Sequence, residues 1–145
     1  MGFMYKTTPL GVKLQPINPI RLMLAAGCGF VARIYAVKEQ VEYILKETSK
    51  YKGFAFIEVL QPCLIFHDDK GYIEKTYSLD KIGHDKTNFD EAWKRAQEFD
   101  YNSINDKTKI PLGIFYQKER TTFEDLSPQL VKLKKKKIGW KDIKR

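Results

Sequence analysis

The segment from Gly53 to Phe66, which reads GFAFIEVLQPCLIF, constrains the fold of this chain more than any other stretch. Its aromatic and β-branched residues predict a buried strand over Phe54–Leu60, with Glu58 as the one charge in it. Proline cannot donate to a strand ladder, so Pro62 ends the pairing, and Cys63 follows at once. A cysteine at the carboxyl end of a strand can present its thiolate to an active site or a metal cluster. From the residues alone, a buried structural thiol is the commoner role.

The residues before this strand predict alternating helices and strands. Asn18 followed by Pro19 is typical of a capped helix start and predicts a helix over Ile20–Ala26. A short strand over Phe30–Tyr35 and a helix over Lys38–Tyr51 come next. This alternation predicts an α/β fold whose parallel sheet is built by right-handed crossovers.

The sequence after Phe66 predicts fewer regular elements. These are a short extended piece within Tyr72–Leu79, an amphipathic helix over Phe89–Tyr101, a strand over Ile110–Tyr116 and a turn or short helix at Phe123–Leu126. Side chains expected to pack inward are Val41, Ile44, Leu45, Phe54, Phe56, Phe89, Trp93, Ala96, Phe99, Phe115 and Tyr116. A parallel sheet needs both of its faces covered and its edges paired, and these roughly three strands are too apolar to leave one side open. The chain therefore looks like part of a larger sheet.

Composition narrows the class of protein. The chain has 145 residues, which fits one domain, and no apolar run reaches the roughly 18 residues that a membrane-spanning helix needs. No signal peptide is visible, and two cysteines make no disulfide framework, so a cytoplasmic location is expected. Cys28 is interpreted as a small packing residue, and His84 with Asp85 as a hydrogen-bonding loop pair. Glu58 needs a partner, either Arg33 or a group on a missing strand.

Almost all of the net charge of +8 comes from the C-terminal residues. Eight basic residues face Asp142 alone there: Lys132, Lys134, Lys135, Lys136, Lys137, Lys141, Lys144 and Arg145. A solubilising tail is the first interpretation, and docking to an acidic partner is the second. Nucleic acid is a weaker alternative, because no groove-reading helix, zinc knuckle or stacking platform accompanies the lysines.

Five motifs, in chain order, carry a family resemblance. They are Pro16–Ile20 (PINPI), Gly29–Arg33 (GFVAR), Lys52–Cys63 (KGFAFIEVLQPC), His84-Asp85 and Ile110–Tyr116 (IPLGIFY). Together they resemble the β subunit of the 2-oxoacid:ferredoxin oxidoreductases, from about its middle to its end. The pattern over residues 16–59 also resembles the C-terminal half of the diphosphate-binding domain of thiamine-diphosphate enzymes. The resemblance implies three parts: residues 1–62 from that domain, a C-terminal extension of the β subunit at 63–131, and a basic tail at 132–145.

The resemblance also implies that this chain supplies only part of the cofactor sites of the family. Cys63 matches one ligand of the family's [4Fe-4S] cluster, whereas the other three cysteines, the Gly-Asp-Gly motif and the downstream Asn for Mg²⁺ diphosphate have no counterpart here. A cluster of this type needs four thiolates. We therefore expect a truncated or split β subunit that is inactive alone and binds no cofactor alone. No catalytic or cofactor-binding residue is assigned.

In the complete enzyme, the resemblance implies thiamine diphosphate, Mg²⁺ and [4Fe-4S] as cofactors. It implies an α subunit, the missing N-terminal half of the β subunit, ferredoxin, a 2-oxoacid and coenzyme A as partners. The alternative is a non-catalytic α/β interaction module that has kept the packing of the fold and lost its cofactors. A nucleic-acid binder with a basic tail is a third and weaker hypothesis.

Overall fold

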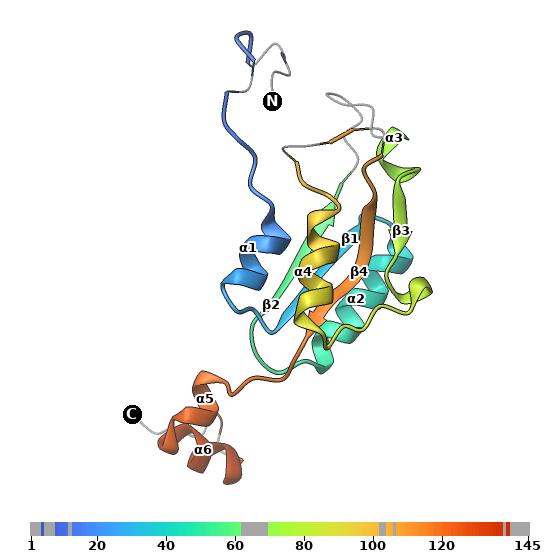
Figure 1. The fold of residues 1–145 in the computed structure, drawn as a ribbon. Coiled ribbons are helices and arrows are strands. Elements are labelled where there is room, and N and C mark those ends of the chain that lie inside the picture. Colours follow the sequence, from blue (N-terminus) through green and yellow to red (C-terminus); the bar gives the residue numbers. More distant parts are fainter. Residues whose placement is uncertain are drawn as a thin grey trace.

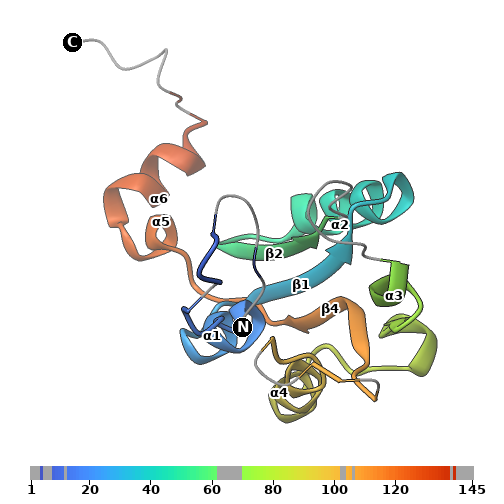
Figure 2. The same ribbon diagram turned by 90° about the horizontal axis from the view of Figure 1, so that it is seen from above.

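A four-stranded sheet forms the centre of the computed structural model, which describes residues 4, 8–11, 13–61, 70–101, 104–105, 107–137 and 139. The strands are β1 (Phe30–Tyr35), β2 (Ala55–Leu60), β3 (Thr76–Ser78) and β4 (Ile110–Gln117), in the order β2-β1-β4-β3. The helices are α1 (Pro19–Ala25), α2 (Lys38–Lys50), α3 (Lys70–Ile73), α4 (Phe89–Gln97), α5 (Phe123–Leu126) and α6 (Pro128–Lys135), with a 3₁₀ turn at Asp80–Ile82. Helix α2 covers one face of the sheet, and α1 and α4 cover the other (Figures 1 and 2).

The sheet is mixed, not wholly parallel. Strands β1 and β2 are parallel and joined through α2, and β3 is parallel to β4. Strand β4, however, runs antiparallel to β1, with a register shift after Val31. The reason lies in the approach to β4: Phe99, just after α4, packs with Tyr35 at the end of β1 and with Ile110 at the start of β4. The predicted α/β class and the parallel pairing of the first two strands are confirmed, and β4 adds an antiparallel neighbour whose direction the sequence does not predict.

Strand β1 is buried on both faces, which explains why all six of its residues are inaccessible. Phe30, Ala32 and Ile34 pack against the Ile44 side of α2. Val31 faces the opposite layer, where α1 and α4 contribute Ile20, Leu24, Ala92 and Ala96. The alternation follows from the two-residue period of a strand.

Helix α1 begins where the sequence predicts. The Asn18 side chain accepts a hydrogen bond from the Arg21 N–H at 3.1 Å, and Pro19 occupies the first turn. Its Nδ2 also donates to the Ala96 carbonyl at 2.9 Å and the Phe99 carbonyl at 3.1 Å. One buried amide therefore caps α1 and ties it to the end of α4.

Several burial predictions fail at the margins of the sheet. Strand β2 is at an edge and only half-buried, and Phe54, which precedes it, is 69% exposed. Leu45 on α2 and Phe89 on α4 are also exposed, and α4 ends at Gln97 instead of Tyr101. An edge strand has a neighbour on one side only, so its side chains and those flanking it lose cover.

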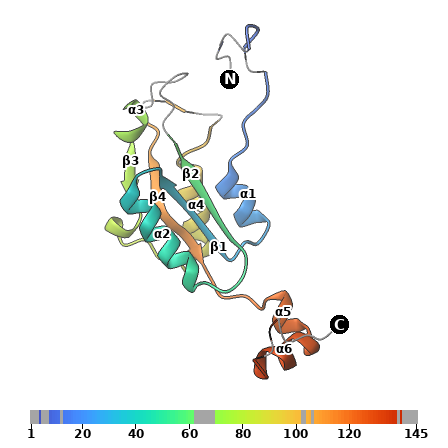
Figure 3. The same ribbon diagram turned by 180° about the vertical axis from the view of Figure 1, so that it is seen from behind.

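The C-terminal residues form an arm of two helices, α5 and α6, that lies away from the sheet (Figures 1 and 3). Thr122 and Asp125 form a capping box on α5, and Pro128 opens α6. The sequence predicts the basic character of this region but not the α6 helix. Across the residues that the structure describes, no helix has the length and apolar character to cross a membrane.

Candidate functional site

The carboxyl end of β2 is the place to which the sequence assigns a function. Leu60 is paired with Tyr35, and its carbonyl accepts the Ala36 N–H at 2.9 Å. Gln61 follows as an exposed residue. Pro62, Cys63 and the neighbouring His67 lie outside the described residues, so the assignment of Cys63 as a metal ligand stays a prediction.

A buried ion pair lies just before this end. Arg33 on β1 and Glu58 on β2 are register partners, and the Arg33 Nε donates to Glu58 Oε2 at 2.6 Å. The Arg33 side chain is completely buried and that of Glu58 is 11% exposed. The prediction that Glu58 has a partner is confirmed, and the partner is Arg33.

Aromatic rings enclose the guanidinium group. The Arg33 Cζ lies 4.9 Å from the ring centre of Phe99 and 5.3 Å from that of Phe115. Such contacts stabilise a cation that has lost its water. The Nη1 and Nη2 atoms are buried and have no hydrogen-bond partner within the described part of the chain. Glu58 therefore supplies the charge compensation for Arg33.

Tyr101 completes the cluster from a distant part of the sequence. Its hydroxyl donates to Glu58 Oε1 at 2.7 Å, so both carboxylate oxygens accept a hydrogen bond. Burial, followed by the charge of Glu58, raises the pKa of Tyr101 above its usual value, which keeps the phenol protonated as a donor. The sequence analysis missed Tyr101, because nothing in its spacing connects it to a residue 43 positions earlier.

The Arg33, Glu58 and Tyr101 side chains act together as a structural clamp. They join the two parallel strands and the segment after α4 through one carboxylate. Both hydrogen bonds run between members of the cluster. The clamp positions the chain just before the segment that contains Cys63.

The second cysteine has the packing role predicted for it. Cys28 is 7% exposed, and its Sγ donates to the carbonyl of Phe30 at 3.1 Å. It comes before β1, whereas Gln61 follows β2, and the two strands are parallel. Roughly 20 Å of strand therefore separates the two ends.

His84 and Asp85 also have loop roles, as the sequence predicts. The His84 Nε2 lies 2.8 Å from the Phe115 carbonyl oxygen, and Asp85 accepts hydrogen bonds from the backbone and hydroxyl of Thr87. These hydrogen bonds lower the pKa of Asp85. In the described ranges, no group of three or more His, Cys, Asp or Glu residues is placed to hold a metal ion.

Comparison with known proteins gives one consistent family. The family model for the C-terminal region of the pyruvate ferredoxin oxidoreductase beta subunit matches residues 67–132. A 2-oxoacid:ferredoxin oxidoreductase subunit beta of Saccharolobus solfataricus is 35% identical over 82% of this chain and 41% of that protein. The subunit beta of 2-oxoacid:ferredoxin oxidoreductase 1 of Aeropyrum pernix is 35% identical over 79% of this chain and 38% of its own length.

A solved structure agrees with the fold. The 2-oxoglutarate:ferredoxin oxidoreductase of Magnetococcus marinus, solved with 2-oxoglutarate, coenzyme A and succinyl-CoA bound, superposes with a TM-score of 0.72 at 24% identity. The match covers 94% of this chain and 44% of that one. The chain thus spans about two fifths of the length of the relatives it matches. By sequence, it belongs to the family of 2-oxoacid:ferredoxin oxidoreductase β subunits.

Proposed function

We propose that this chain is the C-terminal part of a 2-oxoacid:ferredoxin oxidoreductase β subunit and that it works only inside a larger complex. The observation that carries the proposal is the 35% identity to β subunits over 82% of the chain, which extends over the strand leading to Cys63. The reaction of that complex is the thiamine-dependent oxidative decarboxylation of a 2-oxoacid to its coenzyme A thioester. Electrons leave through a [4Fe-4S] cluster to ferredoxin.

The open edge of β2 supports the proposal that this chain pairs with a partner chain. In the described sheet β2 pairs only with β1, and its outer side has no strand beside it. Val59 on this strand and Leu22 on the nearby α1 are each 49% exposed, and Ile17 before α1 is 68% exposed. An apolar strand with an uncovered edge favours pairing with another chain. We infer that the N-terminal half of the β subunit pairs here, whether it is encoded separately or joined to this sequence.

We further propose that Cys63 supplies one thiolate of the cluster. Four thiolates are needed, and this sequence has two cysteines. Cys28 cannot be the second ligand, because it lies at the opposite end of the strand pair from Gln61 and its Sγ is committed to the Phe30 carbonyl. The cluster would therefore be shared, with three ligands from the partner half. The cluster would supply one-electron transfer, and Cys63 would anchor it to β2.

The same proposal divides the chain into three parts. Residues 1–62 would complete a thiamine-diphosphate domain and residues 63–131 would form the β-subunit extension, although both contribute strands to one sheet. Residues 132–145 would form the basic tail, whose lysines are suited to an acidic partner such as ferredoxin. Thiamine diphosphate and Mg²⁺ would be held by the partner half, and the α subunit would complete the assembly.

Anaerobic co-expression with the candidate N-terminal half and α subunit tests the proposal. We expect a brown complex with about four iron and four sulfide per β subunit. Cys63→Ser should lower the iron and sulfide content and the visible absorption, and Cys28→Ser is the matched control that should leave both unchanged. A colourless chain that purifies without partners would instead support the non-catalytic interaction module.

A further inference from the structure

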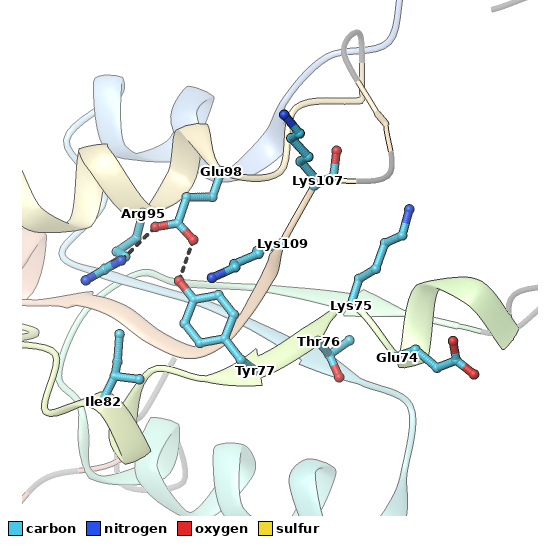
Figure 4. A pocket seen from close by; sticks show the side chains of 10 residues that line it. Glu74, Lys75, Thr76, Tyr77, Ile82, Arg95, Glu98, Lys107 and Lys109 are labelled. Atoms are coloured by element: carbon cyan, nitrogen blue, oxygen red, sulfur yellow. Dashed lines mark hydrogen bonds and ion pairs between the residues drawn. The ribbon is translucent and has the colours of Figure 1, made fainter.

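A pocket of about 1090 Å³ opens at the β3 edge of the sheet, the edge opposite to β2. Strand β3, the end of α4 and the residues that lead into β4 form its walls (Figure 4). Four cationic side chains line it, against two carboxylates: Lys75, Arg95, Lys107 and Lys109, with Glu74 and Glu98. None of the described residues that line it belongs to the clamp.

Both carboxylate oxygens of Glu98 accept hydrogen bonds within the pocket. It accepts a hydrogen bond from the Tyr77 hydroxyl at 2.5 Å and another from Arg95 Nη1 at 2.7 Å. Burial and the hydrogen bond to Glu98 raise the pKa of Tyr77, so the phenol stays a neutral donor. The charges of Arg95 and Glu98 cancel each other. Among the described lining residues, the three lysines are therefore left with Glu74 as the only other carboxylate.

Hydrogen bonds hold the Lys75 side chain and the backbone of Lys75 and Lys107 in place. The Lys75 Nζ donates to the Asn105 carbonyl at 3.0 Å, and the Lys75 carbonyl accepts the Ile110 N–H at 3.0 Å. On the other wall, the Lys107 N–H donates to Asn105 Oδ1 at 2.9 Å, and Asn105 N–H donates to Thr108 Oγ1 at 2.8 Å. Within the described residues, none of the three lysines has an ion pair with a carboxylate closer than about 4 Å.

The side chains give the pocket two chemically different regions. The Lys109 side chain points toward Tyr77, whereas Lys75 and Lys107 extend upward in this view, away from the Tyr77 ring (Figure 4). The Tyr77 ring and Ile82 supply an apolar wall. Three lysines with little counter-charge around one pocket attract an anion, and lysine is a common ligand of phosphate groups.

We propose that this pocket binds a phosphorylated anion of nucleotide size. Its diphosphate would contact Lys107, Lys109 and Lys75, and its flat organic part would pack on Tyr77 and Ile82. The volume is sufficient, because pockets for such ligands measure roughly 300–1000 Å³. The inference does not depend on the proposed oxidoreductase function, since the binding groups all come from this chain.

Isothermal titration of the full chain with inorganic pyrophosphate, ADP and coenzyme A tests the site. We expect saturable binding of pyrophosphate that weakens as salt rises, and tighter binding of ADP or coenzyme A if the apolar wall takes part. The double variant Lys107→Gln with Lys109→Gln should weaken pyrophosphate binding by about tenfold or more. The comparison of ADP with coenzyme A identifies which diphosphate the wall accepts.

The control is Lys134→Gln with Lys135→Gln, which removes the same charge from exposed positions on α6. It should leave the affinity for pyrophosphate within about twofold. Equal weakening by both double variants would overturn the proposal, because it would show non-specific attraction to a basic surface. So would the lack of saturable binding for all three probes. Unfolding curves of both variants, with Lys109→Gln as a milder substitution, check that the loss is not caused by misfolding.

Discussion

At the residue scale, the Arg33–Glu58 pair is the most demanding feature of the molecule. A buried guanidinium with one carboxylate as its charge partner tolerates no loss of that partner. We expect Glu58→Gln to lower the free energy of unfolding by about 3 kcal/mol, because the amide keeps the shape but leaves the Arg33 cation uncompensated. Urea denaturation of the full chain, followed by circular dichroism, measures the change.

The matched control is Glu42→Gln, whose exposed side chain lies 3.8 Å from Lys38. An exposed pair of this kind contributes less than about 1 kcal/mol, so this variant should unfold almost like the parent. If Glu58→Gln cost no more than Glu42→Gln, Arg33 would have another source of charge compensation.

Two of the three clamp residues, Arg33 and Glu58, can be predicted as partners from the sequence, and the third cannot. Glu58 within an apolar strand signals a partner, and Arg33 is one of few candidate cations on a neighbouring strand. Tyr101 gives no such signal, because its hydroxyl reaches Glu58 only after α4 has crossed the sheet. Cys63, whose role rests on its family resemblance, stays a prediction.

At the scale of elements, Asn18 joins two helices through the two ends of one amide. Its oxygen caps α1, and its nitrogen donates to two carbonyls at the end of α4. Asn18→Asp keeps the cap but replaces both donors by an oxygen that repels the carbonyls. We therefore expect it to destabilise the chain by about 1–3 kcal/mol, although aspartate is as good a cap as asparagine.

Asn88→Asp is the control for this prediction. Asn88 caps α4 in the same way, by accepting hydrogen bonds from Asp90 N–H and Glu91 N–H, but its side chain is exposed. The thermal unfolding midpoint of this variant should stay close to that of the parent. A similar loss in both variants would mean that the α1–α4 connection through Nδ2 contributes nothing.

Local signals explain which elements the sequence predicts well. The Asn18-Pro19 start, β1 and α2 follow from capping, β-branched runs and helical periodicity within a few residues. Strand β3 has only three residues, and its place beside β4 depends on contacts more than thirty residues away. Helix α6 was not predicted, because its lysine-rich sequence is compatible with either an irregular tail or a helix.

At the scale of the whole molecule, the direction of β4 and the exposure of β2 share one cause. Both depend on which strands are neighbours, and a sequence pattern specifies faces and lengths but not neighbours. The apolar composition of β2 predicted a covered strand. In the described chain it lies at an edge, and relatives more than twice as long contain further residues that could cover it.

Pairing at the β2 edge can be tested with one backbone substitution. In a parallel ladder the N–H and C=O of a residue face the same neighbour, and successive residues alternate. The Leu60 carbonyl is bonded to Ala36 on the β1 side, so the Val59 N–H faces the open edge. Proline is tolerated in an edge strand where its missing N–H would face outward. Val59→Pro should therefore leave the isolated chain folded but remove co-purification with the N-terminal half of the β subunit.

Val59→Thr controls for the side chain, because threonine has nearly the same shape and retains the N–H. It should co-purify with the partner half as the parent chain does. If Val59→Pro also co-purifies, the partner does not add a strand to β2, and the exposed apolar residues of α1 become the better candidates for the contact. If instead the proline variant is unfolded alone, the outward direction of the Val59 N–H is wrong. The two readouts together thus separate a lost interface from a lost fold.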